Sequence, residues 1–178
     1  MATLGQRMVG AMKADVPTFE EIERDPTAMG QAVTVIIIAG VAVMIGNIFR
    51  SGIGWGIASL IISLIGYGIW TVLVTLIGTK LMPEPSTKAD FAETFRTIGF
   101  AASPGIFNVL MIIPFLGPVI GFFISIWSLV IMVIAVRTVL DYTSTGRAIV
   151  VCLIGFIIYW IVSFVILTPL FLGAAMFG

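Results

Sequence analysis

The chain alternates between long apolar runs without charge and short polar segments. The uncharged runs cover residues 26–49, 51–79, 97–136 and 148–178. A membrane-spanning helix needs about 20 consecutive apolar residues. Three of the four runs therefore predict one span each, at residues 32–49, 55–79 and 149–175.

The run from 97 to 136 is too long for one helix, and it is interrupted at Pro114-Phe-Leu-Gly-Pro118. Two prolines around a glycine favour a tight turn. The run therefore predicts two short spans, at residues 98–113 and 119–138, which either cross the membrane fully or form a re-entrant hairpin. The predicted fold is an all-α, polytopic bundle of five transmembrane helices.

Composition and charge support this interpretation and add an orientation. The chain is 60% hydrophobic and carries only 9 basic and 9 acidic residues in 178, whereas globular domains have about a quarter charged residues. Basic residues favour the cytoplasmic side. With the N-terminus inside, that side holds all of them except Arg50, namely Arg7, Lys13, Arg24, Lys80, Lys88, Arg96, Arg137 and Arg147.

This orientation divides the chain into a cytoplasmic segment, residues 1–29, and a five-span domain, residues 30–178, whose C-terminus is outside or lumenal. We expect an integral protein of the plasma (inner) membrane in a prokaryote, or of the ER or Golgi in a eukaryote. The lipid bilayer is its first partner. Zero net charge and the lack of a basic cluster argue against nucleic acid.

The residue types present leave little room for catalysis. The chain has no histidine, so Ser-His and Cys-His nucleophilic systems and imidazole ligands are excluded. Cys152 lies alone in an apolar run, and the predicted spans contain no ionisable residue of the kind that ion-coupled transporters use. We expect no enzymatic activity, no cofactor and no metal.

The first 29 residues predict short helices at the membrane surface. Leu4, Met8 and Met12 recur at helical spacing, which predicts an amphipathic helix in the membrane interface, with a frayed terminus as the alternative. Thr18 and Glu21 have the spacing of a capping box. Asp25-Pro26 is typical of a helix start and predicts the beginning of the first span.

Four carboxylates in this segment allow two interpretations. Glu20, Glu21, Glu23 and Asp25 could attract a hard cation, but helical spacing directs Glu21 away from the face shared by Glu20 and Glu23. We therefore favour a solvated acidic face. A second short interfacial helix is predicted from residue 86 to residue 96, before the third span, where Phe91 and Phe95 are four residues apart.

Small residues are spaced for close helix packing. They recur at intervals of four residues in the third and fourth spans, at Gly99 and Ser103, at Ala101 and Gly105, and at Gly117, Gly121 and Ser125. Pro104 adds a kink to the third span. These stripes favour packing within one chain, and a homo-oligomer interface is the alternative.

Four sequence patterns stand out: Gly99-Phe100-x-x-x-Pro104 in the third span, Gly117-Pro followed by Ile126-Trp127-Ser128 in the fourth, Tyr142-x-x-x-x-Arg147-Ala148 before the fifth, and Pro17-x-x-Glu20-Glu21-Ile22 before the first. Together they resemble the Yip family of Ypt/Rab-interacting membrane proteins. The resemblance covers about residues 15–170. It is nearer to the short bacterial and archaeal members than to the eukaryotic ones.

The resemblance implies a five-span protein with a cytoplasmic N-terminus. Eukaryotic relatives bind prenylated Rab-type GTPases and shape membranes, and their acidic segment before the first span matters for this, which transfers a partner-binding role to Glu21 and Ile22. The expected function is a non-enzymatic membrane scaffold or adaptor with an unidentified membrane or cytoplasmic partner. The alternatives are a small-molecule or lipid permease, for which Asn108, Tyr67 and Tyr159 are the polar candidates, and an accessory subunit of a larger membrane complex.

Overall fold

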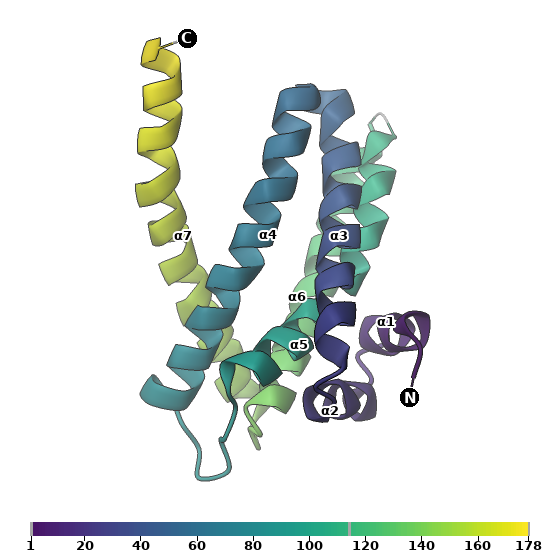
Figure 1. The fold of residues 1–178 in the computed structure, drawn as a ribbon, viewed down its shortest axis with the longest axis vertical. Helices are drawn as coiled ribbons and strands as arrows, with labels where there is room; N and C mark the ends of the chain where they lie inside the picture. Colours follow the sequence, from purple (N-terminus) through teal and green to yellow (C-terminus); the bar gives the residue numbers. More distant parts are fainter. Residues whose placement is uncertain (1, 114, 178) are drawn as a thin grey trace.

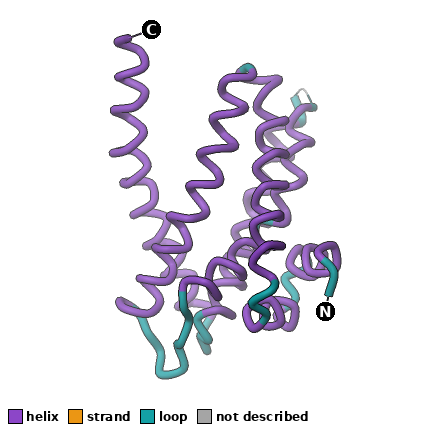
Figure 2. The backbone as a smooth tube through the Cα atoms, in the orientation of Figure 1, coloured by secondary structure: helices purple, strands orange, loops and turns teal. Residues whose placement is uncertain are grey.

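The computed structural model describes residues 2–113 and 115–177, apart from the side chains of residues 49–51 and 166–177. Figures 1 and 2 show a helical bundle, and five helices of the described chain are long and apolar enough to cross a membrane. They are α3 (Ala28–Ser51), α4 (Ile53–Leu76) with the π-helical turn η1 (Ile77–Leu81), α5 (Phe91–Ala101) with the 3₁₀ helix η2 (Ser103–Ile112), α6 (Gly117–Val139) and α7 (Thr145–Phe177). The predicted all-α, five-span fold is confirmed.

The third span changes from α-helix to 3₁₀-helix at its proline. Pro104 has no N–H for the carbonyl of Phe100, and the Ser103 hydroxyl donates to that carbonyl instead, at 2.6 Å. A 3₁₀ helix rises about 2.0 Å per residue against 1.5 Å in an α-helix. The ten residues of η2 therefore extend further than the same number in an α-helix. The third span is also longer than predicted, because α5 begins at Phe91, within the segment predicted as a separate interfacial helix, and is followed directly by η2.

The turn between η2 and α6 lies at the same end of the bundle as the turn at Gly52 between α3 and α4 (Figure 1). Gly46, near the end of α3, lies beside the backbone of Asn108 in η2. The third and fourth spans therefore extend to the same end of the bundle as α3 and α4, an arrangement that favours full crossing over a re-entrant hairpin. The turn is shorter than predicted, because Pro118 already belongs to the first turn of α6. Pro114 lies outside the described residues.

Helices α1 (Leu4–Met12) and α2 (Val16–Arg24) lie across one end of the bundle (Figure 1). The predicted capping box of Thr18 and Glu21 is wrong. The helix starts earlier, and the Asp15 carboxylate caps it by accepting from the Thr18 N–H at 3.1 Å. Phe19 and Ile22 lie three residues apart on one face of this helix, and both are fully buried in the core.

The predicted start of the first span at Asp25-Pro26 is also wrong. Asp25 is the C-cap of α2, and Thr27 is the N-cap of α3. The Asp25 carboxylate still binds the N–H of Thr27, at 2.9 Å, so it closes the tight connection between α2 and α3. In α1 the cap is a Thr3–Gln6 capping box.

Small residues form the seam between α3 and the third span. A side chain on Gly99 would meet the Cβ of Ala32 at 2.9 Å, and one on Gly105 would meet the Cβ of Ala39 at 2.8 Å. Ala32, Ala39 and Gly46 are seven residues apart and so share one face of α3. The two backbones approach closely along this face, as small residues permit in membranes.

The small residues of the fourth span do not all face one neighbour. Gly117 and Gly121 are buried against Met111 of η2. Ser125, one turn further along α6, is exposed, and its hydroxyl donates to the Gly121 carbonyl at 2.8 Å. Of these three small residues, only the two glycines face η2. Pro104 is buried at the start of η2.

Candidate functional site

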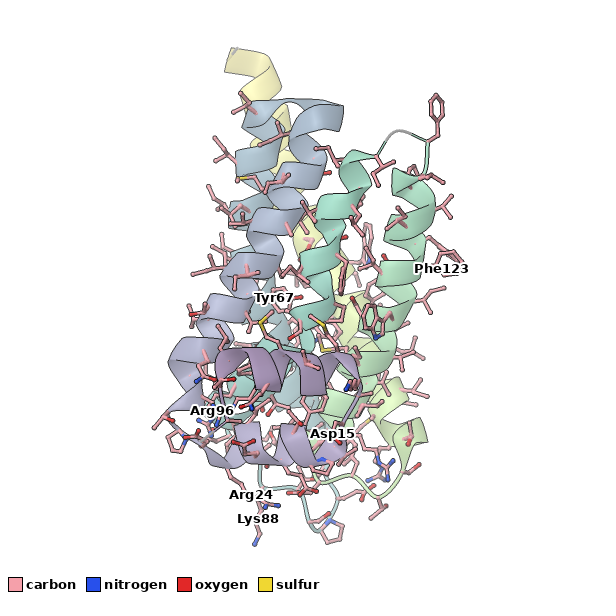
Figure 3. All side chains as sticks on the ribbon, turned by 90° about the vertical axis from the view of Figure 1, so that its right-hand side faces the viewer. Asp15, Arg24, Tyr67, Lys88, Arg96 and Phe123 are labelled. Carbon is pink, nitrogen blue, oxygen red and sulfur yellow. The ribbon has the colours of Figure 1, made fainter. Side chains whose placement is uncertain are left out.

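Polar side chains gather at the end of the bundle that carries α1 and α2 (Figure 3). We call this the charged end. It comprises α1, α2, the loop at residues 82–90 with the start of α5, and the α6–α7 turn at residues 140–144. The labelled Asp15, Arg24, Lys88 and Arg96 lie there, whereas Tyr67 and Phe123 lie further along the bundle. A recognition site for a charged ligand or partner is therefore most favoured here.

Arg7 is buried at the centre of this end, with a side chain only 1% exposed. Its Nη2 atom donates to Glu21 at 3.0 Å and to Asp25, and its Nη1 atom donates to Gln31 at 3.0 Å. Its Nε atom has no partner among the described residues. One buried guanidinium thus joins α1, α2 and α3.

The sequence contained a signal for this burial. Arg7 follows Leu4 by three residues and precedes Ala11 by four, so it lies on the apolar face of α1 rather than on the polar side. That face in the structure is Arg7, Met8 and Ala11, all buried. A basic residue on the inner face of a short helix predicts a buried acidic partner.

Arg96 is a second buried arginine that binds α2. Its side chain comes from α5 and is 6% exposed. The Nε atom donates to the Ile22 carbonyl at 3.4 Å, and the Nη2 atom donates to the Glu23 carbonyl. These are carbonyls of the last turn of α2, where a cation is favoured by the helix dipole. Two arginines therefore fix α2 to the bundle.

This arrangement changes how the two predicted partner-binding residues can act. The Glu21 carboxylate is 45% exposed, and it faces both solvent and Arg7. The Ile22 side chain is fully buried among the helices, so a partner would reach it only if α2 moved away. Glu20 lies on the exposed side of α2 and pairs with Arg24 at 3.2 Å.

Three of the four carboxylates of the acidic segment pair with two different arginines. Glu21 and Asp25 bind Arg7, while Glu20 binds Arg24. Asp25 has a pKa of about 2, lowered by its hydrogen bonds with Thr27 and Arg7. Within the described residues, no group of three or more acidic or cysteine side chains has the arrangement of a metal site.

The loop at residues 82–90 is tied to the α6–α7 turn. The buried Tyr142 hydroxyl donates to the Met82 carbonyl at 2.8 Å. The Glu84 carboxylate accepts from the Thr143 N–H at 3.1 Å and pairs with Arg147 at 3.5 Å. These contacts fix the shape of the charged end on the side opposite α1.

A hollow of about 740 Å³ separates α2 from the α6–α7 turn. We call it the polar hollow, because its lining includes Glu20, Glu23, Arg24, Arg137, Asp141 and Thr145. Burial, followed by repulsion from Asp141 and Glu93, raises the pKa of Glu23 to about 7. Arg137 is exposed, and its guanidinium donates to Thr145 Oγ1 at 3.0 Å and to the carbonyls of Tyr142 and Thr143 at 3.3 Å and 3.4 Å.

The three polar residues considered for a permeation path do not lie together. Tyr67 and Tyr159 line a hollow between α4, α6 and α7. Asn108 lies in the seam with α3 instead, where its Nδ2 atom donates to the Gly105 carbonyl at 2.9 Å and the Asn108 carbonyl faces Gly46. The three candidates for a permeation path therefore belong to two separate places.

Comparison with protein families gives one match. A family model described as the Yip1 domain matches residues 10–175. Searches of curated proteins and of solved structures find no match to the chain. The matched range includes α2 with the two carbonyls that Arg96 binds, helices α3 to α6, and α7 as far as residue 175.

Proposed function

Because the chain belongs to the Yip1 domain family and is an integral membrane protein with five apolar helices, we propose that it is a non-enzymatic scaffold or adaptor. In this proposal the five helices hold the charged end at the membrane surface, and α2 presents a binding face to a protein partner. The observation that carries the proposal is the fixation of α2 by two buried arginines.

Holding a helix with buried arginines has a large desolvation cost. Desolvating a guanidinium costs several kcal/mol, and well-packed apolar side chains are often at least as stabilising. Arg7 and Arg96 nevertheless take such positions at opposite sides of α2. Their directional hydrogen bonds set the orientation of the helix, which is what a preformed binding surface requires.

The exposed face of α2 suggests the chemistry of the partner. Glu20 and Glu21 are each 45% exposed, and Arg24 is 76% exposed. The partner that fits this mainly acidic face carries a basic or mixed-charge segment. A Rab-type GTPase follows from family analogy alone, so the partner is to be identified without assuming its class. The membrane is the plasma membrane in a prokaryotic source or the ER or Golgi in a eukaryotic one.

The test combines site-specific crosslinking with one charge reversal. A photoactivatable residue at position 20 in the full-length chain, expressed at native level, is expected to crosslink a specific partner that mass spectrometry identifies. Glu20→Arg should abolish recovery of that partner. Lys88→Glu is the matched control, because Lys88 is equally at the charged end but belongs to the loop at residues 82–90.

The proposal fails if Glu20→Arg and Lys88→Glu recover the partner equally, or if position 20 crosslinks only lipid. Thermal unfolding of both variants in detergent separates lost recognition from lost folding. A stoichiometric set of membrane proteins crosslinked through the spans, rather than through α2, would instead identify an accessory subunit. A permease has no comparable support, since Asn108 is separate from Tyr67 and Tyr159.

A further inference from the structure

An apolar groove begins where the polar hollow ends. It has a volume of about 530 Å³ and lies between α6 and α7, over Trp70 of α4. Its lining is apolar and includes Leu129, Val133, Ile149, Leu153 and Phe156. Ile134 and Thr145 line both the groove and the polar hollow, so a charged compartment adjoins an apolar one at the membrane boundary.

The length of the groove matches one leaflet of a bilayer. Thr145 is the first residue of α7 and Phe156 lies eleven residues further on, a distance of about 16 Å along the helix. The hydrocarbon core of a bilayer is about 30 Å thick, so half of it is close to this length. An acyl chain that enters at Thr145 would fill the groove to the middle of the membrane.

The charges of the polar hollow select the headgroup. The hollow contains three carboxylates and two guanidinium groups, those of Glu20, Glu23, Asp141, Arg24 and Arg137. A purely anionic headgroup would meet more negative than positive charge there. A headgroup with both a phosphate and an ammonium matches both signs.

The order of the charges along the hollow also matches such a headgroup. Arg137 is hydrogen-bonded to Thr145, at the boundary with the apolar groove, and only three of its five N–H donors have acceptors in the described structure. Glu23 lies on the opposite wall, on α2, where it is partly desolvated and repelled by Asp141. Phosphate next to Arg137 and ammonium next to Glu23 follow the order of groups in a phospholipid.

We propose that the polar hollow and the apolar groove together bind one phospholipid of the ethanolamine class, from the leaflet at the charged end. One of its two acyl chains lies between α6 and α7, its phosphate contacts Arg137 and Thr145, and its ammonium contacts Glu23 and Asp141. A primary ammonium donates hydrogen bonds to carboxylates, which a quaternary choline headgroup cannot do. The site therefore prefers ethanolamine over choline lipids.

The preference can be measured by native mass spectrometry of the full-length protein in detergent. The protein is titrated with dioleoyl phosphatidylethanolamine, phosphatidylcholine or phosphatidylglycerol, which share their acyl chains. We expect the ethanolamine lipid to bind about tenfold more tightly than the choline lipid, the scale of one charge-assisted hydrogen bond. Equal binding of all three lipids, or tightest binding of the glycerol lipid, would overturn the proposal.

Variants assign the preference to the site. Glu23→Gln and Asp141→Asn should each reduce ethanolamine binding toward the choline level, while Leu153→Trp should weaken both lipids by filling the groove. Lys88→Gln, an exposed charge outside the hollow, and Val72→Trp, an exposed apolar position of α4 outside the groove, are the controls. If Glu23→Gln and Asp141→Asn both fold normally and keep the ethanolamine preference, the proposed headgroup site is wrong.

Discussion

Neutralising both carboxylates that face Arg7 should release α1 and α2 from the bundle. The double variant Glu21→Gln/Asp25→Asn keeps the size of both side chains, and the amide oxygen at position 25 can still accept from Thr27. What remains is a guanidinium that is 1% exposed, has no carboxylate and already has an unpartnered Nε atom. Stranding a buried charge in this way costs about 3–5 kcal/mol.

Removing the arginine instead should cost much less. In Arg7→Met the remaining carboxylates of Glu21 and Asp25 are 45% and 17% exposed, so water can solvate them. The loss should be about 1 kcal/mol or less, the scale of an exposed ion pair. The triple variant, with all three substitutions, should recover most of the stability that the double variant loses, because no buried charge is left.

Hydrogen exchange in detergent, followed by mass spectrometry, measures this local opening. The amides of α1 and α2 should exchange roughly a hundredfold faster or more in the double variant, and the triple variant should return to within about tenfold of the wild type. Residues 63–76 of α4 serve as the internal control. The reasoning is refuted if Arg7→Met opens α1 and α2 as much as the double variant does, or if the triple variant shows no recovery.

Three further measurements test other parts of the structure. The pKa of Glu23 is raised from 4.5 to about 7, so the contribution of this group to stability is complete below about pH 4.5 and is lost as the pH rises through about 7. The Tm should therefore decrease between these two pH values. In Glu23→Gln, the Tm should depend less on pH over the same range. Gly99→Ala should lower the free energy of unfolding in denaturant by about 1–3 kcal/mol, because the added methyl group would meet Ala32. Adding Ala32→Gly should restore the lost stability. Gly30→Ala is the control, because a side chain at this position meets nothing within 4 Å, and it should leave the free energy of unfolding unchanged or slightly higher. Tyr142→Phe removes the buried hydrogen bond to the Met82 carbonyl. Trypsin should then cleave the loop at residues 82–90 faster than in the wild type. An unchanged cleavage rate would show that this hydrogen bond does not hold the loop in place.

The helical starts show where sequence reasoning was sufficient and where it was not. Both Asp15 and Thr18 are good cap residues, and local preference does not choose between them. The structure uses Asp15, because this start buries Phe19 and Ile22 and brings Glu21 to Arg7. Tertiary contacts therefore decided between two locally acceptable helices.

The site residues follow the same division. The sequence placed the acidic segment before the first span correctly, but it did not reveal that Arg7 and Arg96 hold that segment against the bundle. Arg96 binds backbone carbonyls, which every residue has, so the sequence does not show which residues accept its hydrogen bonds. Arg7 could have been recognised by its place on the apolar face of α1.

The five spans were determined by the sequence alone, because a bilayer requires about 20 apolar residues and satisfied backbone hydrogen bonds from every crossing segment. The neighbours of each span were decided only by the tertiary structure. A soluble helix marks its buried side with apolar residues, but lipid and protein interior are equally apolar, so hydropathy does not distinguish the faces of α3. Steric fit does, and it places Ala32, Ala39 and Gly46 against the third span, where the backbones can come closest.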